Sequence, residues 1–158
     1  MEIQRITSFE VDHGVLLPGF YISRIDGDVT TYDLRTRRPN GGDYMSNLAM
    51  HSAEHMYATF LRNGPMKADI IYFGPMGCQT GFYLLVRSQA PAAVFAEVKR
   101  VLREILAYDG PVFGASAKEC GNYRNLDLDA AKAECQAYLT VLEGCSDTDF
   151  SYPKGDNI

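Results

Sequence analysis

The feature that most constrains this chain is a pair of histidines four positions apart, His51 and His55, with Glu54 between them. On an α-helix, positions i and i+4 lie one turn apart on the same face, where two imidazoles reach one metal ion. Glu54 projects from the same side, where a carboxylate moves protons on whatever the metal holds. The pattern H-x-x-E-H is the inverted form of the zincin motif.

The residues on both sides of this motif predict the helix that it requires. The turn cluster at 40–43 ends in Asp43, a good N-cap residue, and Asn63-Gly64-Pro65 is a stop signal. Between them, small or apolar residues recur at helical spacing, Ser52 among them. The sequence therefore predicts a largely buried helix that carries a metal site. The alternative is two core histidines satisfied by hydrogen bonds, an interpretation that suits a single histidine better than this pattern.

Length and charge narrow the class of protein. A chain of 158 residues fits a single domain, 1–158, with a substantial core. The net charge of −5 argues against a nucleic-acid binder, and no apolar run approaches the about 18 residues of a membrane span. The N-terminus lacks the layout of a signal peptide, so we expect a cytoplasmic protein. Its four cysteines are then expected to be thiols or metal ligands rather than disulfides.

The rest of the chain reads as strands and helices in turn. Alternating or apolar β-branched and aromatic runs predict strands at 20–25, 29–34, 68–73 and 82–86, and amphipathic patterns predict helices at 92–107 and 127–143. Glu97 is expected to face water and Cys135 to lie in the core. Residues 145–158 are predicted to form a loose polar tail. The arginines after the first hairpin, Arg35 among them, are either a solvated strand end or an anion site for a substrate carboxylate.

Two cysteines stand out from the other two. Cys78 lies in a loop with three glycines and a proline, which can expose its thiol and bring backbone N–H groups close to a ligand. Cys120 precedes a glycine in a polar loop. Two helix histidines and Cys120 make three protein ligands, which leaves a fourth position for water or substrate, as in catalytic sites.

Taken together, these motifs resemble the S-ribosylhomocysteine lyase family, bacterial enzymes that make the autoinducer-2 precursor. The resemblance covers about residues 5–143 and rests on five motifs in order: SFEVDH at 8–13, DLR at 33–35, HSAEH at 51–55, PMGCQTGFY at 75–83 and ECGNY at 119–123. It implies an α+β fold with helices packed on an antiparallel sheet, in agreement with the predicted elements. It also implies a homodimer with its active sites at the subunit interface.

The resemblance also implies roles for particular residues. His51, His55 and Cys120 would hold one divalent metal, Fe(II) in the native enzymes, although Zn or Co can occupy the same ligands. Glu54 and Cys78 would be the acid/base pair. The pocket for the sugar and homocysteine would be lined by Ser8, His13 and Arg35. Tyr72 departs from the family, whose members often carry an aspartate near the homocysteine end, so the resemblance implies the chemistry but not the details of amino-acid recognition.

The implied reaction suits these residues. The substrate is a thioether, and its thiolate leaves readily only when it lies β to a carbonyl whose α-proton has been removed. Two isomerisations move the carbonyl along the sugar, and a β-elimination then releases homocysteine and 4,5-dihydroxy-2,3-pentanedione. Two alternatives stay open: a metallopeptidase of the H-x-x-E-H type, and a non-catalytic metal-binding module in which Cys78 is a bystander.

Overall fold

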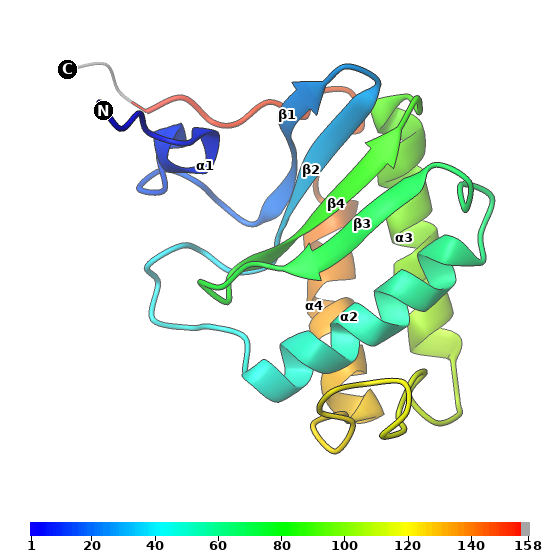
Figure 1. Cartoon of the computed structure of the whole chain (residues 1–158). Helices are drawn as coiled ribbons and strands as arrows, with labels where there is room; N and C mark the ends of the chain where they lie inside the picture. Colours follow the sequence, from blue (N-terminus) through cyan, green and yellow to red (C-terminus); the bar gives the residue numbers. More distant parts are fainter. Residues whose placement is uncertain (156–158) are drawn as a thin grey trace.

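Two antiparallel hairpins form the sheet around which the chain folds (Figure 1). The structure is a computed structural model and describes residues 1–155. The strands are β1 (Gly19–Asp26), β2 (Val29–Arg35), β3 (Ile70–Pro75) and β4 (Gly81–Arg87). They lie in the order β1-β2-β4-β3, with every neighbouring pair antiparallel. All four predicted strands are confirmed, although β3 begins and ends two residues later than expected.

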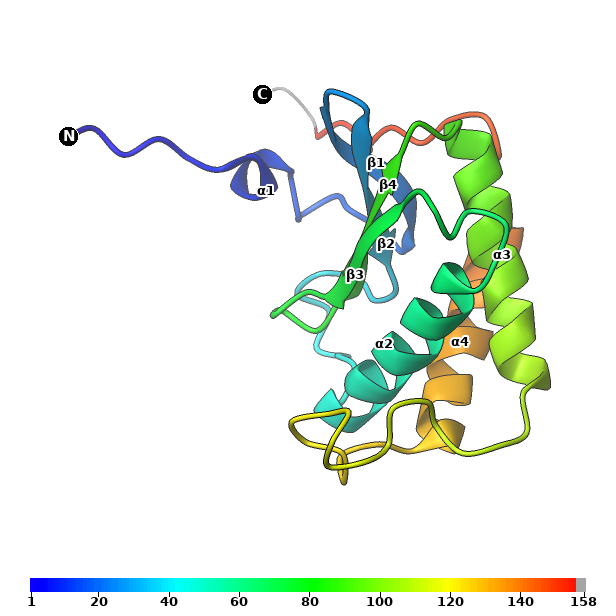
Figure 2. The same ribbon diagram turned by 45° about the vertical axis from the view of Figure 1, so that its right-hand side comes forward.

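Three helices cover one face of this sheet and leave the other face open (Figure 2). They are α2 (Asn47–Arg62), α3 (Pro91–Ala107) and α4 (Leu128–Glu143). A single helical turn, α1 (Thr7–Glu10), lies on the open side. The α+β fold expected from the resemblance is therefore confirmed. Within residues 1–155, none of the helices combines the length and apolar character that a membrane span needs.

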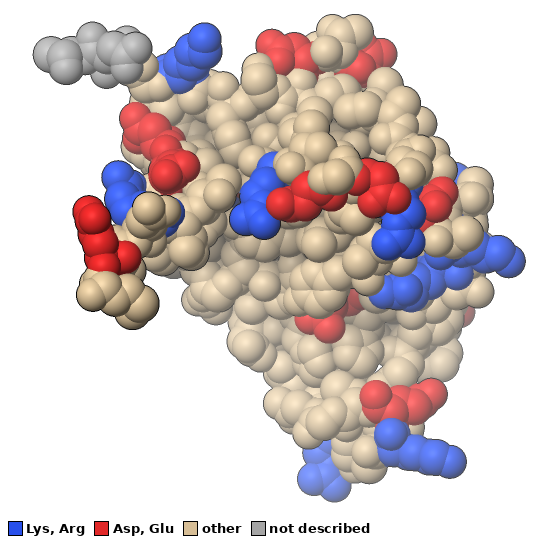
Figure 3. Space-filling model, turned by 45° about the horizontal axis from the view of Figure 1, so that its top comes forward, with Lys and Arg blue, Asp and Glu red and all other residues tan. Residues whose placement is uncertain are grey.

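Successive side chains of a β-strand point to opposite faces of the sheet. On β4, Phe82, Leu84 and Val86 are buried in the core beneath the helices. Tyr83 and Leu85 face the open side, where they line a cavity. On the face drawn in Figure 3, acidic and basic side chains are interspersed. The predicted core position of Cys135 is confirmed, because this thiol is fully buried among core residues.

The start of α2 differs from the prediction. Its N-cap is Ser46, whose hydroxyl accepts a hydrogen bond from the Ala49 backbone N–H at 3.1 Å, and not Asp43. The chain before Ser46 stays extended because Met45 is held by Gln79: the Met45 N–H donates to the Gln79 carbonyl at 3.0 Å, and the Gln79 side-chain amide donates to the Met45 carbonyl at 3.0 Å. This long-range pairing leaves no signal in the local sequence.

Glu97 was expected in water but is 6% exposed. The turn after α2 lies over it, and a side chain in place of Gly64 would collide with the Glu97 carboxylate. Its charge is balanced by Arg100, one turn further along α3. A buried carboxylate is tolerated because it is paired.

Residues 145–155 do not form the loose tail that the sequence predicted, and the last three residues of that prediction, 156–158, lie outside the described residues. Phe150 is 7% exposed and packs against Phe20 and Phe95, with both ring-centroid distances at 5.5 Å. The Ile22 backbone N–H donates to the Phe150 carbonyl at 2.7 Å. The segment therefore runs along the outer edge of β1 and closes the core there (Figure 1).

Replacing Phe150 with alanine is expected to lower the free energy of unfolding by about 3 kcal/mol, because it leaves a cavity between two aromatic rings. Urea denaturation checks this. Ile25→Thr is the control: the Ile25 side chain is 64% exposed and threonine keeps the β-branch, so the change should alter stability by less than about 0.5 kcal/mol. Equal stability of both variants would show that the segment is not docked in solution.

Candidate metal centre and neighbouring thiol

The structure brings His51, His55 and Cys120 together. The histidines project from adjacent turns of α2, and Cys120 comes from the loop between α3 and α4. Their ligand atoms all lie within 4.8 Å of one another, and Cys120 Sγ is 3.5 Å from His51 Nε2. The three residues that the sequence singled out as ligands therefore form a group of a size that can surround one metal ion.

The hydrogen bonds around the two histidines fit a metal. His51 Nδ1 lies 2.8 Å from the Asn125 carbonyl oxygen, and His55 Nδ1 lies 2.7 Å from that of Phe113. A carbonyl only accepts, so we assign the proton of each ring to Nδ1, which leaves the Nε2 lone pair for a metal. Two imidazole nitrogens and a thiolate are donors typical of sites for Fe(II) or Zn.

A second set of hydrogen bonds ties the Cys120 loop to α2. The hydroxyl of Ser52 accepts from the Asp127 backbone N–H at 2.8 Å and donates to the Leu48 carbonyl at 2.7 Å. The Asn125 side chain donates to Asn47 Oδ1 at 2.6 Å. From the sequence, Ser52 was expected only as a small residue of the buried helix face. Its hydroxyl was the available signal, because a buried hydroxyl needs a hydrogen-bond partner.

Replacing Cys120 with alanine is expected to weaken metal binding by more than about 100-fold, which exceeds the usual effect of losing an outer partner of a ligand. Chelator competition and metal analysis measure this. Cys145→Ala is the control, because Cys145 is also a half-buried free thiol but lies outside the group. Full metal occupancy in Cys120→Ala would remove this cysteine from the set of ligands.

Glu54 lies beside the group rather than in it. Its half-buried side chain and His51 line a cavity of about 260 Å³. The cavity wall also includes Pro75, at the end of β3, just before the loop that carries Cys78. A carboxylate placed here can exchange protons with a molecule in the cavity.

Cys78 is exposed in the β3–β4 loop, as the glycine-rich sequence predicted. The thiol sulfur lies 3.0 Å from Thr80 Oγ1. The left-handed residue of this loop is Gln79, with φ 65°, rather than a glycine, and its two bonds to Met45 hold it in that conformation. By contrast, burial raises the pKa of Cys135 to about 12, so that thiol stays protonated and inert.

Arg35 is neither part of a solvated strand end nor a free cation, because it is 2% exposed. Its Nε and Nη2 donate to the two oxygens of Asp33 at 3.1 and 2.6 Å, and its Nη1 donates to Thr80 Oγ1 at 2.8 Å. Arg35 is thereby linked to the Cys78 loop. Asp33 and Thr80 lie in the motifs DLR and PMGCQTGFY, but neither was assigned a role from the sequence. The available signal was the i, i+2 spacing of Asp33 and Arg35, which places both on one face of β2.

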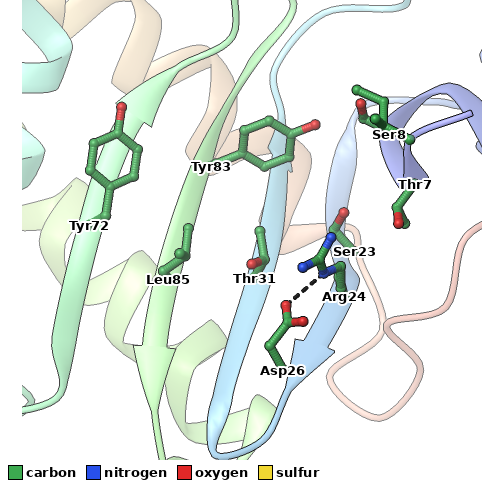
Figure 4. Close-up of a pocket in the computed structure, with 10 residues that line it drawn as sticks. Thr7, Ser8, Ser23, Arg24, Asp26, Thr31, Tyr72, Tyr83 and Leu85 are labelled. Carbon is green, nitrogen blue, oxygen red and sulfur yellow. Dashed lines mark hydrogen bonds and ion pairs between the residues drawn. The ribbon is translucent and has the colours of Figure 1, made fainter. Parts of the chain in front are cut away.

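Within one chain, Ser8 and His13 lie apart from the group formed by His51, His55 and Cys120. Ser8 belongs to α1 and lines a cavity of about 580 Å³ on the open face of the sheet, together with Tyr72 and Tyr83 (Figure 4). His13 Nδ1 is 2.8 Å from the Val11 carbonyl oxygen. In Figure 1, α1 lies far from the loop that carries Cys120. Tyr72 is half-exposed in the Ser8 cavity.

The fold and the site together define a small α+β protein with three clustered donors that could hold a metal ion, and with an exposed thiol. The family model for S-ribosylhomocysteinase (LuxS) matches residues 6–148. The S-ribosylhomocysteine lyase of Borreliella afzelii (strain PKo) is 41% identical, covering 96% of this chain and 100% of that protein. Its counterpart in Desulfotalea psychrophila is 44% identical, covering 96% and 99%. The chain therefore belongs to the S-ribosylhomocysteinase (LuxS) family.

Proposed function

We propose that this protein cleaves S-ribosylhomocysteine to homocysteine and 4,5-dihydroxy-2,3-pentanedione, with the help of a bound metal. The observation that carries the proposal is the group formed by His51, His55 and Cys120 in a member of this family. The Nδ1 atoms of both histidines are hydrogen-bonded to backbone carbonyls, which leaves their Nε2 atoms for a metal. The relatives at about 41% identity are named S-ribosylhomocysteine lyases, which are carbon–sulfur lyases.

The reaction needs neither water nor an oxidant. Two isomerisations shift the carbonyl of the ribose chain until the sulfur lies β to it. Removal of the α-proton then expels homocysteine as a thiolate. The atoms of the two products add up to those of the substrate. What the protein must supply is proton transfer and stabilisation of negative charge on sugar oxygens.

One divalent metal per subunit fits the donors present. We propose Fe(II), with Zn or Co able to occupy the same ligands. When bound, the metal supplies a Lewis acid that polarises the carbonyl and hydroxyl oxygens of the sugar. Cys120, His51 and His55 would hold it, and metal analysis of protein purified without oxygen identifies the native ion.

We assign proton transfer to Cys78 and Glu54. Cys78 stands on an exposed and tightly held loop, where its sulfur is accessible to a substrate carbon. Glu54 lines the same cavity as His51, within reach of groups on the sugar. As an acid/base pair, the two side chains remove a proton at one position and return it at the next as the carbonyl moves.

We propose that Ser8, His13 and Arg35 contribute to the substrate pocket and that the protein acts as a homodimer in the cytoplasm. The N-terminal segment exposes Ile3, Ile6 and Phe9, and the open sheet face beside it lacks a helical cover. A second subunit placed on this face would bury those side chains and bring its own residues to the cavity. Analytical ultracentrifugation measures the oligomeric state.

Identification of the products tests the proposed reaction. Fe(II)-loaded protein is incubated with S-ribosylhomocysteine, and the products are analysed by mass spectrometry. The proposal expects homocysteine and 4,5-dihydroxy-2,3-pentanedione in equal amounts. Homocysteine with free ribose would indicate hydrolysis of the thioether instead. Cleavage of casein by the same preparation, without action on S-ribosylhomocysteine, would support a metallopeptidase.

A further inference from the structure

The segment after α4 reaches both faces of the sheet at the edge formed by β1. Phe150 enters the core on the helical side. Tyr152 lies on Tyr21, with ring centroids 5.1 Å apart and an interplanar angle of 26°, and its hydroxyl donates to Asp33 Oδ2 at 2.6 Å. The family model ends at residue 148, so this contact comes from a part of the chain that the family match does not cover.

From Tyr152, hydrogen bonds continue to the Cys78 thiol. The Tyr152 hydroxyl and Arg35 Nη2 both donate to Asp33 Oδ2. Arg35 Nη1 then donates to Thr80 Oγ1 at 2.8 Å, and Thr80 Oγ1 lies 3.0 Å from Cys78 Sγ. Asp33 and Arg35 are almost completely buried, at 0% and 2% exposure. The chain of contacts is therefore shielded from water for most of its length.

The direction of these bonds follows from the groups involved. Burial, followed by the nearby Asp33 carboxylate, raises the pKa of Tyr152, so the phenol stays protonated and acts as the donor. Because Arg35 has no acceptor, it donates to Thr80 Oγ1. The hydroxyl proton of Thr80 is then free to point at Cys78, with the sulfur as acceptor.

We propose that Tyr152 is a positioning residue for Cys78, acting through Asp33, Arg35 and Thr80. The inference rests on the proposed function, in which Cys78 transfers protons. A buried ion pair keeps one geometry only while its members are fully hydrogen-bonded. Without the Tyr152 hydroxyl, Asp33 Oδ2 keeps a single donor, so the pair can shift and the Thr80 hydroxyl loses its alignment with the sulfur.

Tyr152→Phe tests this, because it removes the hydroxyl and keeps the ring on Tyr21. We expect kcat to fall about three- to tenfold, the effect of one net hydrogen bond, with KM unchanged. We expect iodoacetamide to alkylate Cys78 more slowly by a similar factor, as measured by peptide mass spectrometry. Alkylation of Cys145 in the same sample should not change. Tyr21→Phe is the matched control, because its hydroxyl donates to the Leu17 carbonyl instead.

A double variant tests whether Tyr152 acts on Cys78 through Thr80. Thr80→Val removes the hydroxyl that lies between Arg35 and the sulfur, so adding Tyr152→Phe to it should not slow Cys78 alkylation further. Additive effects would overturn the route through Thr80. Unchanged Cys78 alkylation in Tyr152→Phe would overturn the positioning role, as would faster alkylation of both Cys78 and Cys145, which indicates general loosening. Absence of homocysteine release by the wild type would instead overturn the proposed function, because alkylation does not depend on turnover.

Discussion

Cys78→Ala is expected to lower homocysteine release by about a hundred- to ten-thousandfold, the usual contribution of a positioned acid or base. The side chain is exposed at the tip of a loop, so its loss removes chemistry without opening a cavity in the core. The loop should keep its shape, because it is held by the two Gln79–Met45 hydrogen bonds and not by the thiol. Metal content should equal that of the wild type.

Cys145→Ala is the control for this experiment, because it removes a thiol far along the chain from the Cys78 loop. It should release homocysteine at the wild-type rate. If Cys78→Ala turned over like the wild type, Cys78 would be a bystander and the non-catalytic interpretation of this thiol would hold. If Cys78→Ala lost its metal, Cys78 would instead belong to the metal site.

Glu54→Gln is expected to keep its metal and lose turnover by a similar factor of about a hundred to ten thousand. Glutamine has nearly the same shape as glutamate but does not take up a proton. Glu54 lies beside the three ligands in the cavity lined by His51 and is not one of the group. Metal analysis and the rate of homocysteine release, measured on one preparation, separate the two effects.

Glu104→Gln is a matched control, since Glu104 is an exposed glutamate on α3. It should change neither metal content nor rate. Loss of metal from Glu54→Gln would make Glu54 a ligand or a support for the ligands. Full activity in that variant would exclude the carboxylate from proton transfer.

The clustering of His51, His55 and Cys120 could be predicted from sequence because helical geometry is local. The i, i+4 spacing of His51 and His55 places their side chains on one face once a helix is present, and Cys120 was the third donor that a polar loop offered. The exposed thiol of Cys78 followed in the same way from its glycine-rich surroundings. The strands and long helices followed from periodicity.

What could not be predicted depends on contacts between distant segments. Because Met45 pairs with Gln79, the N-cap of α2 is Ser46 and not Asp43 as predicted. The docking of Phe150 depends on a gap between β1 and α3 that exists only after folding. The burial of Arg35 against Asp33 could not be predicted for a different reason. The pattern of a strand does not indicate which of its faces another segment will cover.

The central proposal is that this chain releases homocysteine from S-ribosylhomocysteine with a metal held by His51, His55 and Cys120. Its most direct test follows free thiol with a chromogenic reagent, using wild-type protein loaded anaerobically with Fe(II) and the same protein stripped by a chelator. The account predicts rapid thiol release from the loaded protein, little from the stripped protein, and recovery when Fe(II) is restored. No thiol from a folded protein with full metal content would contradict it.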